Sequence, residues 1–382
     1  MFNASPNTST PDAFTSHAST PGTEHALTDC GWDEGWAAEF APYTAQGLLP
    51  GRVVRVDRGQ CDVMTADGIV RADTSFVTPH DPLRVICTGD WAAVDPDGAG
   101  DPRYVRTYLP RRTSFVRSTS SKRSDGQILA ANVDHAIVAV SLAVELDLGR
   151  IERFLALAWE SGAQPLVVLT KADLVPDPVT LAHLVQDVEG TAPGVQVLTV
   201  SSLTGEGMDV LGAVVAGGTS VLLGISGAGK STLANAMLGA DVMEVQATRD
   251  IDGKGRHTTT TRNLLLLPGG GVLIDTPGLR GVGLYDAETG VGQVFSEIED
   301  YARQCRFHDC AHEAEPGCAV RDAVDRGELA ERRLDSYRKL QRENQWIVAK
   351  TDARLRAEIR REWRLRGAEG RANYEAKRGG RG

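Results

Sequence analysis

The stretch GISGAGKSTL, residues 224–233, follows the apolar run SVLL and precedes the helix-forming run TLANAML, with which it shares Thr232 and Leu233. It matches the pattern G-x-x-x-x-G-K-[S/T] and lies between a predicted strand and a predicted helix, which is the context that this phosphate-binding loop requires. In such a loop, backbone N–H groups and the N-terminal end of the helix face phosphate groups, because both carry positive partial charge. The stretch therefore predicts a nucleotide-binding α/β domain.

The same loop gives the first set of candidate binding residues. We expect the ammonium group of Lys230 to reach the terminal phosphates and the hydroxyl of Ser231 to ligate magnesium. A flexible glycine-rich turn without a ligand is the alternative, and the strand-loop-helix context favours the phosphate loop. The predicted phosphate-binding residues in this loop are Gly224, Ile225, Ser226, Gly227, Ala228, Gly229, Lys230, Ser231 and Thr232.

Apolar strands alternate with helical segments on both sides of this loop, which indicates a mostly parallel sheet covered on both faces. Before the loop, TKAD at residues 170–173 ends an apolar strand and resembles the guanine-reading motif of GTPases, although Thr170 stands where Asn is commoner. The Asp173 carboxylate can accept the two hydrogens that guanine presents on N1 and N2, a pair that adenine lacks. We expect guanine to be bound by Thr170, Lys171, Asp173, Ser201 and Ser202, the two serines resembling a loop that touches the base.

Two segments after the loop resemble the switch regions of GTPases: GRHTTTT at residues 255–261 and DTPG at residues 275–278. Asp275 ends an apolar strand, so we expect its carboxylate to hold a magnesium-bound water and the Gly278 N–H to bond the γ-phosphate. One of Thr258 to Thr261 should complete the magnesium shell, and Thr259 is favoured. A plain surface turn and a threonine-rich linker are the alternatives for these two segments.

The order of these motifs differs from that of Ras-like proteins, because the base-reading segments precede the phosphate loop. The domain, assigned to residues 125–285, is therefore predicted to be circularly permuted. Together with LPRRTSFVR (109–117) and CRFHDCAHEAEPGCAV (305–320), the motifs resemble the circularly permuted GTPases of the RsgA family, also called YjeQ or EngC, over about residues 47–340. Leu279 follows DTPG in place of a water-orienting Gln, and His257 resembles the residue proposed to orient water in that family.

A compact set of Cys and His residues follows the α/β domain. Cys305, Cys310, His312 and Cys318 form C-x₄-C-x-H-x₅-C, which predicts one tetrahedral, structural zinc ion with four protein ligands. Three buried cysteines beside a surface histidine are the alternative. Six cysteines, three of them isolated, are too few for a disulfide framework, which favours a reducing cytoplasm.

The remaining segments complete a multidomain architecture. Residues 1–40 are expected to be a disordered leader, because they are rich in Ser, Thr, Pro and Ala. Residues 44–115 show short alternating runs that predict a small antiparallel β-barrel, either oligonucleotide-binding (OB) or SH3-like, and the family resemblance implies the OB type. Residues 286–340 are expected to be a helical zinc-binding domain, and residues 341–382 a basic helical tail.

Charge limits the possible nucleic-acid contacts. A formal net charge of −10 argues against bulk coating of nucleic acid, and no apolar run is long enough to span a bilayer. The candidate RNA contacts are Arg111, Arg112 and Arg117, within residues 102–123, where arginines alternate with aromatic residues. Solvated strand faces are the alternative. The tail has 12 basic and 6 acidic residues, so it is a second basic segment.

The resemblance to the RsgA family implies a function. It implies a cytoplasmic, monomeric, ribosome-stimulated GTPase that uses GTP with Mg²⁺, carries one Zn²⁺ and acts as a late checkpoint in maturation of the small (30S) ribosomal subunit. Its expected partners are that subunit, its 16S rRNA and GTP or GDP. Because the second switch leads directly into the zinc domain, loss of phosphate is expected to move that domain. The alternatives are a GTP-binding RNA scaffold with little turnover, and an ATP-using enzyme.

Overall fold

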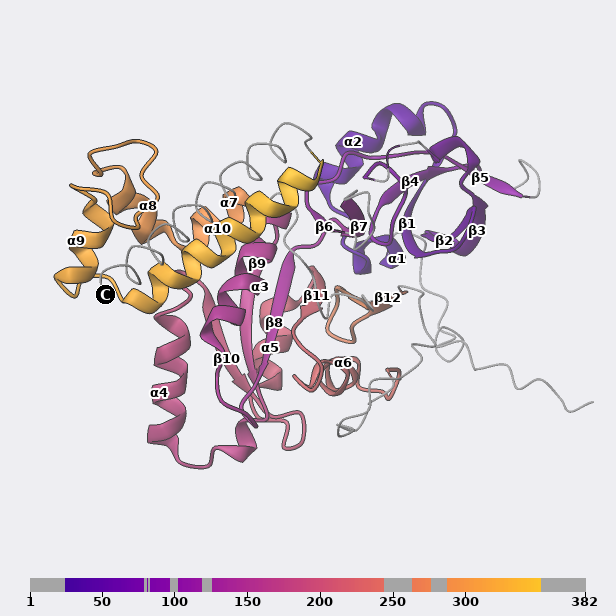
Figure 1. The fold of residues 1–382 in the computed structure, drawn as a ribbon. Coiled ribbons are helices and arrows are strands. Elements are labelled where there is room, and N and C mark those ends of the chain that lie inside the picture. Colours follow the sequence, from indigo (N-terminus) through magenta and orange to yellow (C-terminus); the bar gives the residue numbers. More distant parts are fainter. Residues whose placement is uncertain are drawn as a thin grey trace, which may run out of the picture.

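The computed structural model describes residues 25–78, 81, 83–96, 102–118, 126–243, 263–275 and 287–351. Figure 1 shows three parts: a barrel, an α/β domain in the middle, and a helical unit on the opposite side of that domain from the barrel. No helix within these residues is long and apolar enough to cross a bilayer. The predicted multidomain architecture is confirmed.

The barrel consists of β1 (Leu49–Val56), β2 (Gln60–Thr65), β3 (Gly68–Asp73), β4 (Trp91–Val94) and β5 (Arg103–Tyr108), with the short 3-10 helix η1 (Ser75–Val77) after β3. The strands lie in the order β1-β2-β3-β5-β4, and pairing of β1 with β4 closes the barrel. Val53, Val63, Val94 and Val105 fill its interior and are fully buried. A closed five-stranded barrel has the OB-like form, so the OB alternative is confirmed.

The α/β domain contains six strands in the order β10-β9-β8-β11-β13-β12. They are β8 (His135–Ser141), β9 (Gln164–Thr170), β10 (Gln196–Val200), β11 (Thr219–Leu223), β12 (Asn263–Leu266) and β13 (Val272–Asp275). All neighbours are parallel except β12 and β13. Strand β11, which leads into the phosphate loop, lies between β8 from upstream and β13 from downstream, as a permuted domain requires.

Helices cover both faces of this sheet. They are α3 (Leu148–Ser161), the short 3-10 helix η2 (Ala172–Leu174), α4 (Pro178–Glu189), α5 (Met208–Val215) and α6 (Lys230–Leu238). Two separate hydrophobic clusters pack against the sheet, one including α3 and one including α5 and α6. The nearly continuous burial of β8, β9 and β11 explains why their sequences read as apolar runs.

The barrel and the α/β domain are joined by backbone and side-chain contacts. Strand β1 pairs with β12 at Arg55 and Asn263, so the two sheets are continuous. Arg52 is 1% exposed and donates to the carbonyl of Asn132 and the hydroxyl of Thr219, both at 3.1 Å. Complete burial lowers the pKa of Arg52 to about 10. A hairpin of β6 (Ser114–Ser118) and β7 (Gly126–Ala131) links the two parts along the chain.

The disordered leader expected over residues 1–40 is wrong for residues 25–40, and residues 1–24 lie outside the described part. Helices α1 (His25–Asp29) and α2 (Glu34–Thr44) form here. Asp33 caps α2 by accepting from the Trp36 N–H at 2.7 Å. Trp36 and Phe40 are buried, and Trp36 packs near Trp91 of the barrel. Burial of these aromatic side chains orders the segment despite its polar neighbours.

The C-terminal unit contains the helices α7 (Glu288–Val294), α8 (Ser296–Ala302), α9 (Ala319–Asp325) and α10 (Glu331–Thr351), with a non-helical segment at residues 303–318 between α8 and α9. Helix α10 lies along α7 and α3 (Figure 1), and α7 approaches α3 so closely that a Cβ at Gly290 would lie 2.0 Å from the Ala156 carbonyl oxygen. The expected domain boundary between residues 340 and 341 falls inside α10, because no helix-breaking residue interrupts it.

Candidate functional site

The phosphate-binding loop connects β11 to α6. Gly224, Gly227 and Gly229 adopt φ values of 140°, 82° and 81°, which side chains with a Cβ rarely adopt. A Cβ at Gly224 would also lie 2.6 Å from the Ala139 carbonyl oxygen. The Lys230 ammonium donates to the carbonyl oxygens of Gly224 at 2.7 Å and Ile225 at 2.5 Å. The predicted loop residues therefore form one turn at the N-terminal end of α6.

The predicted guanine-reading residues lie beside this loop. Thr170, the last residue of β9, donates its hydroxyl to the Ala228 carbonyl at 2.8 Å. Lys171 has a left-handed backbone, with φ of 60°, and its ammonium donates to the Gly227 carbonyl at 3.3 Å. Two segments separated by more than fifty residues are thus bonded directly to one another.

Asp173 and Ser201 meet at the edge of the same region. The Ser201 hydroxyl donates to Asp173 Oδ1 at 2.6 Å, and Ser201 is fully buried. The Thr204 N–H in turn donates to the Ser201 hydroxyl at 3.2 Å, which orients it toward the carboxylate. Ser202 follows and is partly exposed. The bond from Ser201 fixes the Asp173 carboxylate through Oδ1 and does not involve Oδ2.

Asp275 lies at the same edge of the sheet as the phosphate loop. It is the last residue of β13, and β13 runs parallel to β11 with Ile274 opposite Val221. Ser231 and Thr232 lie in the first turn of α6; Ser231 is partly exposed and Thr232 is exposed. Three further predicted contacts lie outside the described residues: Gly278 for phosphate, Thr259 for magnesium and His257 for water. Leu279 and the threonines next to Thr259 also lie outside them.

The predicted metal ligands gather in the helical unit. One ligand atom each from Cys305, Cys310, His312 and Cys318 lies within 4.8 Å of all the others. His312 Nδ1 is 3.6 Å from Cys305 Sγ and 3.5 Å from Cys318 Sγ, and the two sulfurs are 3.9 Å apart. His312 is 6% exposed, so the alternative of a surface histidine is wrong. Burial lowers the pKa of His312, which favours the neutral imidazole needed for coordination.

Two of the three arginines predicted to contact RNA, Arg111 and Arg112, have partners inside the protein. Arg111, with a side chain 12% exposed, forms an ion pair with the buried Asp90 at 2.7 Å and donates to the carbonyls of Leu83 and Val85. Arg111 is therefore a structural residue, which corrects its assignment as an RNA contact. Arg112 pairs with Asp33 at 2.6 Å.

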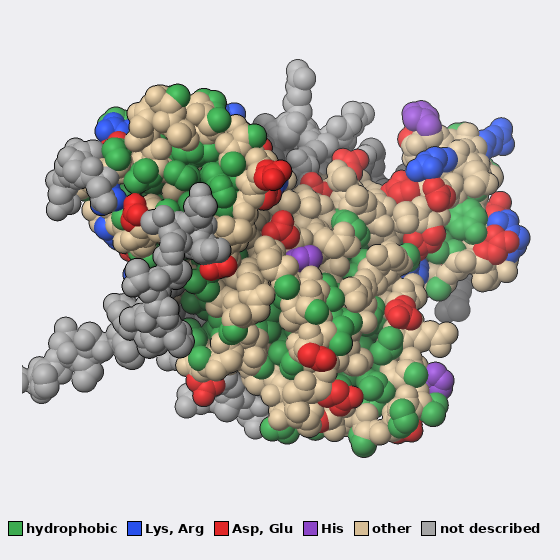
Figure 2. Space-filling model, turned by 180° about the vertical axis from the view of Figure 1, so that it is seen from behind, with side chains coloured by type: hydrophobic (Ala, Val, Ile, Leu, Met, Phe, Trp, Pro, Cys, Tyr) green, Lys and Arg blue, Asp and Glu red, His purple; other side chains and the backbone are tan. Residues whose placement is uncertain are grey.

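Other described residues of that segment also have contacts inside the protein. The Arg112 guanidinium also stacks over Trp36 at 3.8 Å, Phe115 is fully buried, and the side chain of Arg117 lies outside the described part. On the face in Figure 2, basic, acidic and His side chains gather together on the projecting helical unit.

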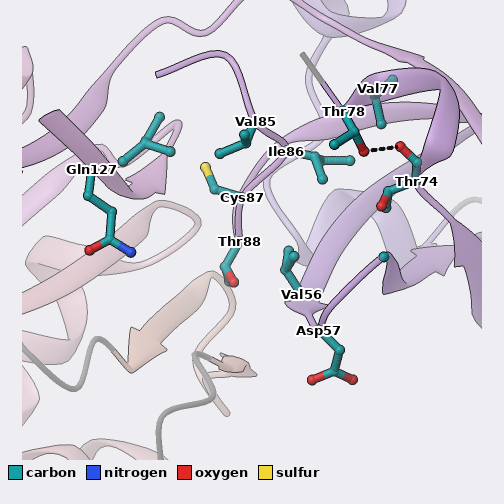
Figure 3. Close-up of a pocket in the computed structure, with 12 residues that line it drawn as sticks. Val56, Asp57, Thr74, Val77, Thr78, Val85, Ile86, Cys87, Thr88 and Gln127 are labelled. Carbon is teal, nitrogen blue, oxygen red and sulfur yellow. Dashed lines mark hydrogen bonds between the residues drawn. The ribbon is translucent and has the colours of Figure 1, made fainter. Parts of the chain in front are cut away.

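A pocket of about 280 Å³ lies elsewhere, between one end of the barrel and β7. Val56, Thr74, Cys87 and Gln127 are among its lining residues, and the Thr78 hydroxyl donates to the Thr74 carbonyl at 2.8 Å (Figure 3). None of its lining residues belongs to the phosphate loop, the predicted guanine-reading segments or the Cys and His cluster. The pocket is therefore separate from the candidate site.

Comparison with known proteins agrees with this geometry. The profile of the RsgA GTPase family matches residues 108–285. The chain is 79% identical over 355 residues to a small ribosomal subunit biogenesis GTPase RsgA of Streptomyces avermitilis, covering 93% of this chain and 95% of that protein. It is 40% identical over 351 residues to the protein of the same description from Opitutus terrae, covering 88% and 95%.

Two solved structures share the fold. YjeQ from Thermotoga maritima aligns with a TM-score of 0.56 and 29% identity, covering 77% of this chain and 97% of that one. YloQ, described as a circularly permuted GTPase, aligns with a TM-score of 0.55 and 22% identity, covering 78% and 94%. The permuted order inferred from the motifs therefore has a counterpart among known structures.

Proposed function

The chain belongs to the RsgA family of GTPases, and we propose that it is a ribosome-stimulated GTPase that acts as a late checkpoint in maturation of the small (30S) ribosomal subunit. As a family member it hydrolyses GTP to GDP and phosphate. Its relatives are described as small ribosomal subunit biogenesis GTPases. The observation that carries the proposal is the bonding of Thr170 to the phosphate loop at Ala228, with Asp173 fixed beside it by Ser201.

We assign guanine recognition to Asp173. A carboxylate accepts hydrogen bonds and cannot donate them when ionised, so it matches the N1 and N2 hydrogens of guanine and not the acceptor N1 of adenine. The bond from Ser201 occupies Oδ1 from the buried side and sets the plane of the carboxylate. The proposed base contacts are Thr170, Lys171, Asp173, Ser201 and Ser202.

The phosphates are assigned to the loop. Backbone N–H groups of residues 224–232 and the N-terminal end of α6 favour negative charge there. Lys230, whose ammonium now bonds two loop carbonyls, is placed to exchange those bonds for phosphate oxygens. Magnesium bound with GTP would be held by Ser231, Thr259 and Asp275, and Gly278 would contact the γ-phosphate.

We assign zinc to the cluster of three cysteines and one histidine. A tetrahedral zinc with Zn–S bonds of about 2.3 Å and Zn–N bonds of about 2.0–2.1 Å places two sulfurs about 3.8 Å apart and a sulfur and a nitrogen about 3.6 Å apart. The separations of 3.9, 3.6 and 3.5 Å in the cluster fit these values. When bound, this ion supplies a cross-link for the helical unit, because four protein ligands leave no open position for chemistry.

For hydrolysis, His257 is the proposed residue that orients water. A protein that has no Gln after DTPG and relies on one loop histidine is expected to turn over slowly until a partner orders its switch segments. We propose that contact with 16S rRNA on the small subunit provides this ordering. GTP then favours the bound form, and conversion to GDP releases the protein, which acts as a cytoplasmic monomer.

The checkpoint is tested by cosedimentation of the protein with purified small subunits in GDP, GTP and a non-hydrolysable GTP analogue. We expect retention with the analogue, weak binding with GDP, and release as GTP is consumed. Asp173→Asn should abolish this nucleotide dependence at GTP concentrations that saturate the wild type. Equal binding in all three conditions would contradict the checkpoint and favour a scaffold whose nucleotide is only a ligand.

A further inference from the structure

We propose that Glu315 is a positioning residue for the metal centre, because its carboxylate holds the backbone turn that presents His312 to the cysteine sulfurs. Glu315 lies between His312 and Cys318 in the sequence and is not one of the four clustered ligands. The inference rests on the proposed metal-binding role of the three cysteines and His312.

The carboxylate of Glu315 binds the backbone on both sides of His312. Glu315 Oε1 accepts from the Ala311 N–H at 3.0 Å. Its Oε2 accepts from the Glu313 N–H at 2.8 Å and from the Ala314 N–H at 3.0 Å. Both oxygens are used, and the residues directly before and after His312 are both held.

His312 needs such support, because its backbone is in the left-handed region with φ of 59°. A residue with a Cβ enters this region infrequently and stays there when its surroundings hold it. Arg338 of α10 also donates to the His312 carbonyl, so the peptide group after His312 is held from outside the turn as well. The result of these contacts is that Nδ1 faces the sulfurs of Cys305 and Cys318.

The charge of Glu315 suits this role. The backbone N–H group of Glu315 itself and those of residues 311, 313 and 314 lower the pKa of its carboxyl, so it is ionised at neutral pH and acts only as an acceptor. A glutamine at this position would turn an NH₂ group toward backbone N–H donors. At least one of the three bonds would be lost, and the turn would hold His312 less firmly.

The test measures metal affinity in the full-length chain for the wild type, Glu315→Gln and Glu313→Gln. Glu313 is the matched control, because it is exposed, lies two residues away and loses the same charge. Competition with a chromophoric zinc chelator gives the affinity, and absorption of the Co²⁺ form reports thiolate ligation. We expect the control to match the wild type and Glu315→Gln to bind zinc about 10- to 100-fold more weakly, as outer-shell changes do.

A second variant tests whether the carboxylate itself is required. Glu315→Asp keeps both acceptor oxygens and the charge, and we expect its zinc affinity to lie between those of the wild type and Glu315→Gln. Equal zinc affinity in Glu315→Gln and Glu313→Gln would overturn the role of Glu315 while leaving the metal site intact. A wild-type chain that binds no zinc would instead overturn the metal assignment, and the role of Glu315 with it.

Discussion

The hydroxyl of Thr170 donates to the carbonyl oxygen of Ala228 at 2.8 Å, across 58 residues of sequence. This bond joins the end of β9, to which we assign recognition of the base, to the loop proposed to bind the phosphates. In a Ras-like chain the phosphate loop comes first, whereas here it follows the base-reading segment. The two segments therefore contact one another in the folded chain although their order in the sequence is permuted.

The contribution of this bond can be measured with Thr170→Val, which keeps the shape of the side chain and removes the donor. The Ala228 carbonyl then loses a buried partner, which costs about 1–3 kcal/mol. We expect GTP affinity, measured by calorimetry, to fall about tenfold, which corresponds to about 1.4 kcal/mol. Thr170→Ser retains the hydroxyl and should bind GTP nearly as the wild type does; equal loss in both variants would contradict the role of the bond.

Base selectivity is expected to depend on Asp173. Asp173→Asn replaces one acceptor oxygen by an NH₂ group, which would face a hydrogen of guanine N1 or N2. Because each charged hydrogen bond contributes about 1.5–3 kcal/mol, we expect GTP affinity to fall about 100-fold or more. Xanthosine triphosphate has a carbonyl where guanine has the amino group, so it should bind the variant better than GTP does. Unchanged preference for GTP over ATP and xanthosine triphosphate would show that another residue reads the base.

A buried ion cluster is expected to fix the helical unit to the α/β domain. Glu152 of α3 is 0% exposed and pairs with Arg333 at 2.8 Å and Arg332 at 3.0 Å. Because Glu152→Gln would leave buried Arg333 with less charge compensation, we expect it to lower the free energy of unfolding by about 3–5 kcal/mol in urea titrations. Asp300→Asn, in an exposed pair with Arg303, should change it by less than about 1 kcal/mol.

The same cluster bears on the expectation that the zinc domain moves when phosphate is lost. A large displacement would have to separate Glu152 from two arginines and open the packing of Gly290 on α3. We therefore expect the helical unit to stay on α3 in both nucleotide states. Hydrogen exchange of α3 and α7 in GDP and in a GTP analogue measures this; strong deprotection in one state would favour the moving domain.

The barrel arginine Arg111 is expected to act in folding. Arg111→Met would leave the carboxylate of Asp90, which is 0% exposed, without its cation, and we expect a loss of about 3–5 kcal/mol in the free energy of unfolding. The salt dependence of RNA binding by the folded variant should stay unchanged, because no phosphate contact is removed. Arg84→Met, at a side chain 78% exposed, is the control for stability. A weaker dependence of RNA affinity on salt concentration in Arg111→Met than in the wild type would show that Arg111 contacts RNA.

Local patterns predicted the elements whose physical causes are local. Glycine spacing gave the phosphate loop, unbroken apolar runs gave the parallel strands, and alternation gave the barrel. The sequence also contained a signal for helix α2, since the aromatic residues Trp32, Trp36 and Phe40 recur every four residues and Asp33 can cap the helix. The prediction of disorder over residues 1–40 rested on their content of Ser, Thr, Pro and Ala, which outweighed the spacing of the aromatic residues.

Some site features could not be predicted from the sequence, because they depend on contacts that form only in the folded chain. Whether Arg111 faces solvent depends on Asp90, which is brought to it by the antiparallel pairing of β4 with β5. The role of Glu315 depends on a turn whose backbone N–H groups converge on one carboxylate. Neither arrangement follows from residue types or spacing, because the first depends on the pairing of two strands and the second on the backbone conformation of one turn.

The most direct test of the proposed function is the rate of GTP hydrolysis with and without purified small ribosomal subunits, with Lys230→Ala as the blank and ATP as a parallel substrate. We predict slow turnover by the protein alone, strong stimulation by the subunits with GTP, and none with ATP. GTP binding that is never followed by subunit-stimulated hydrolysis would contradict the account.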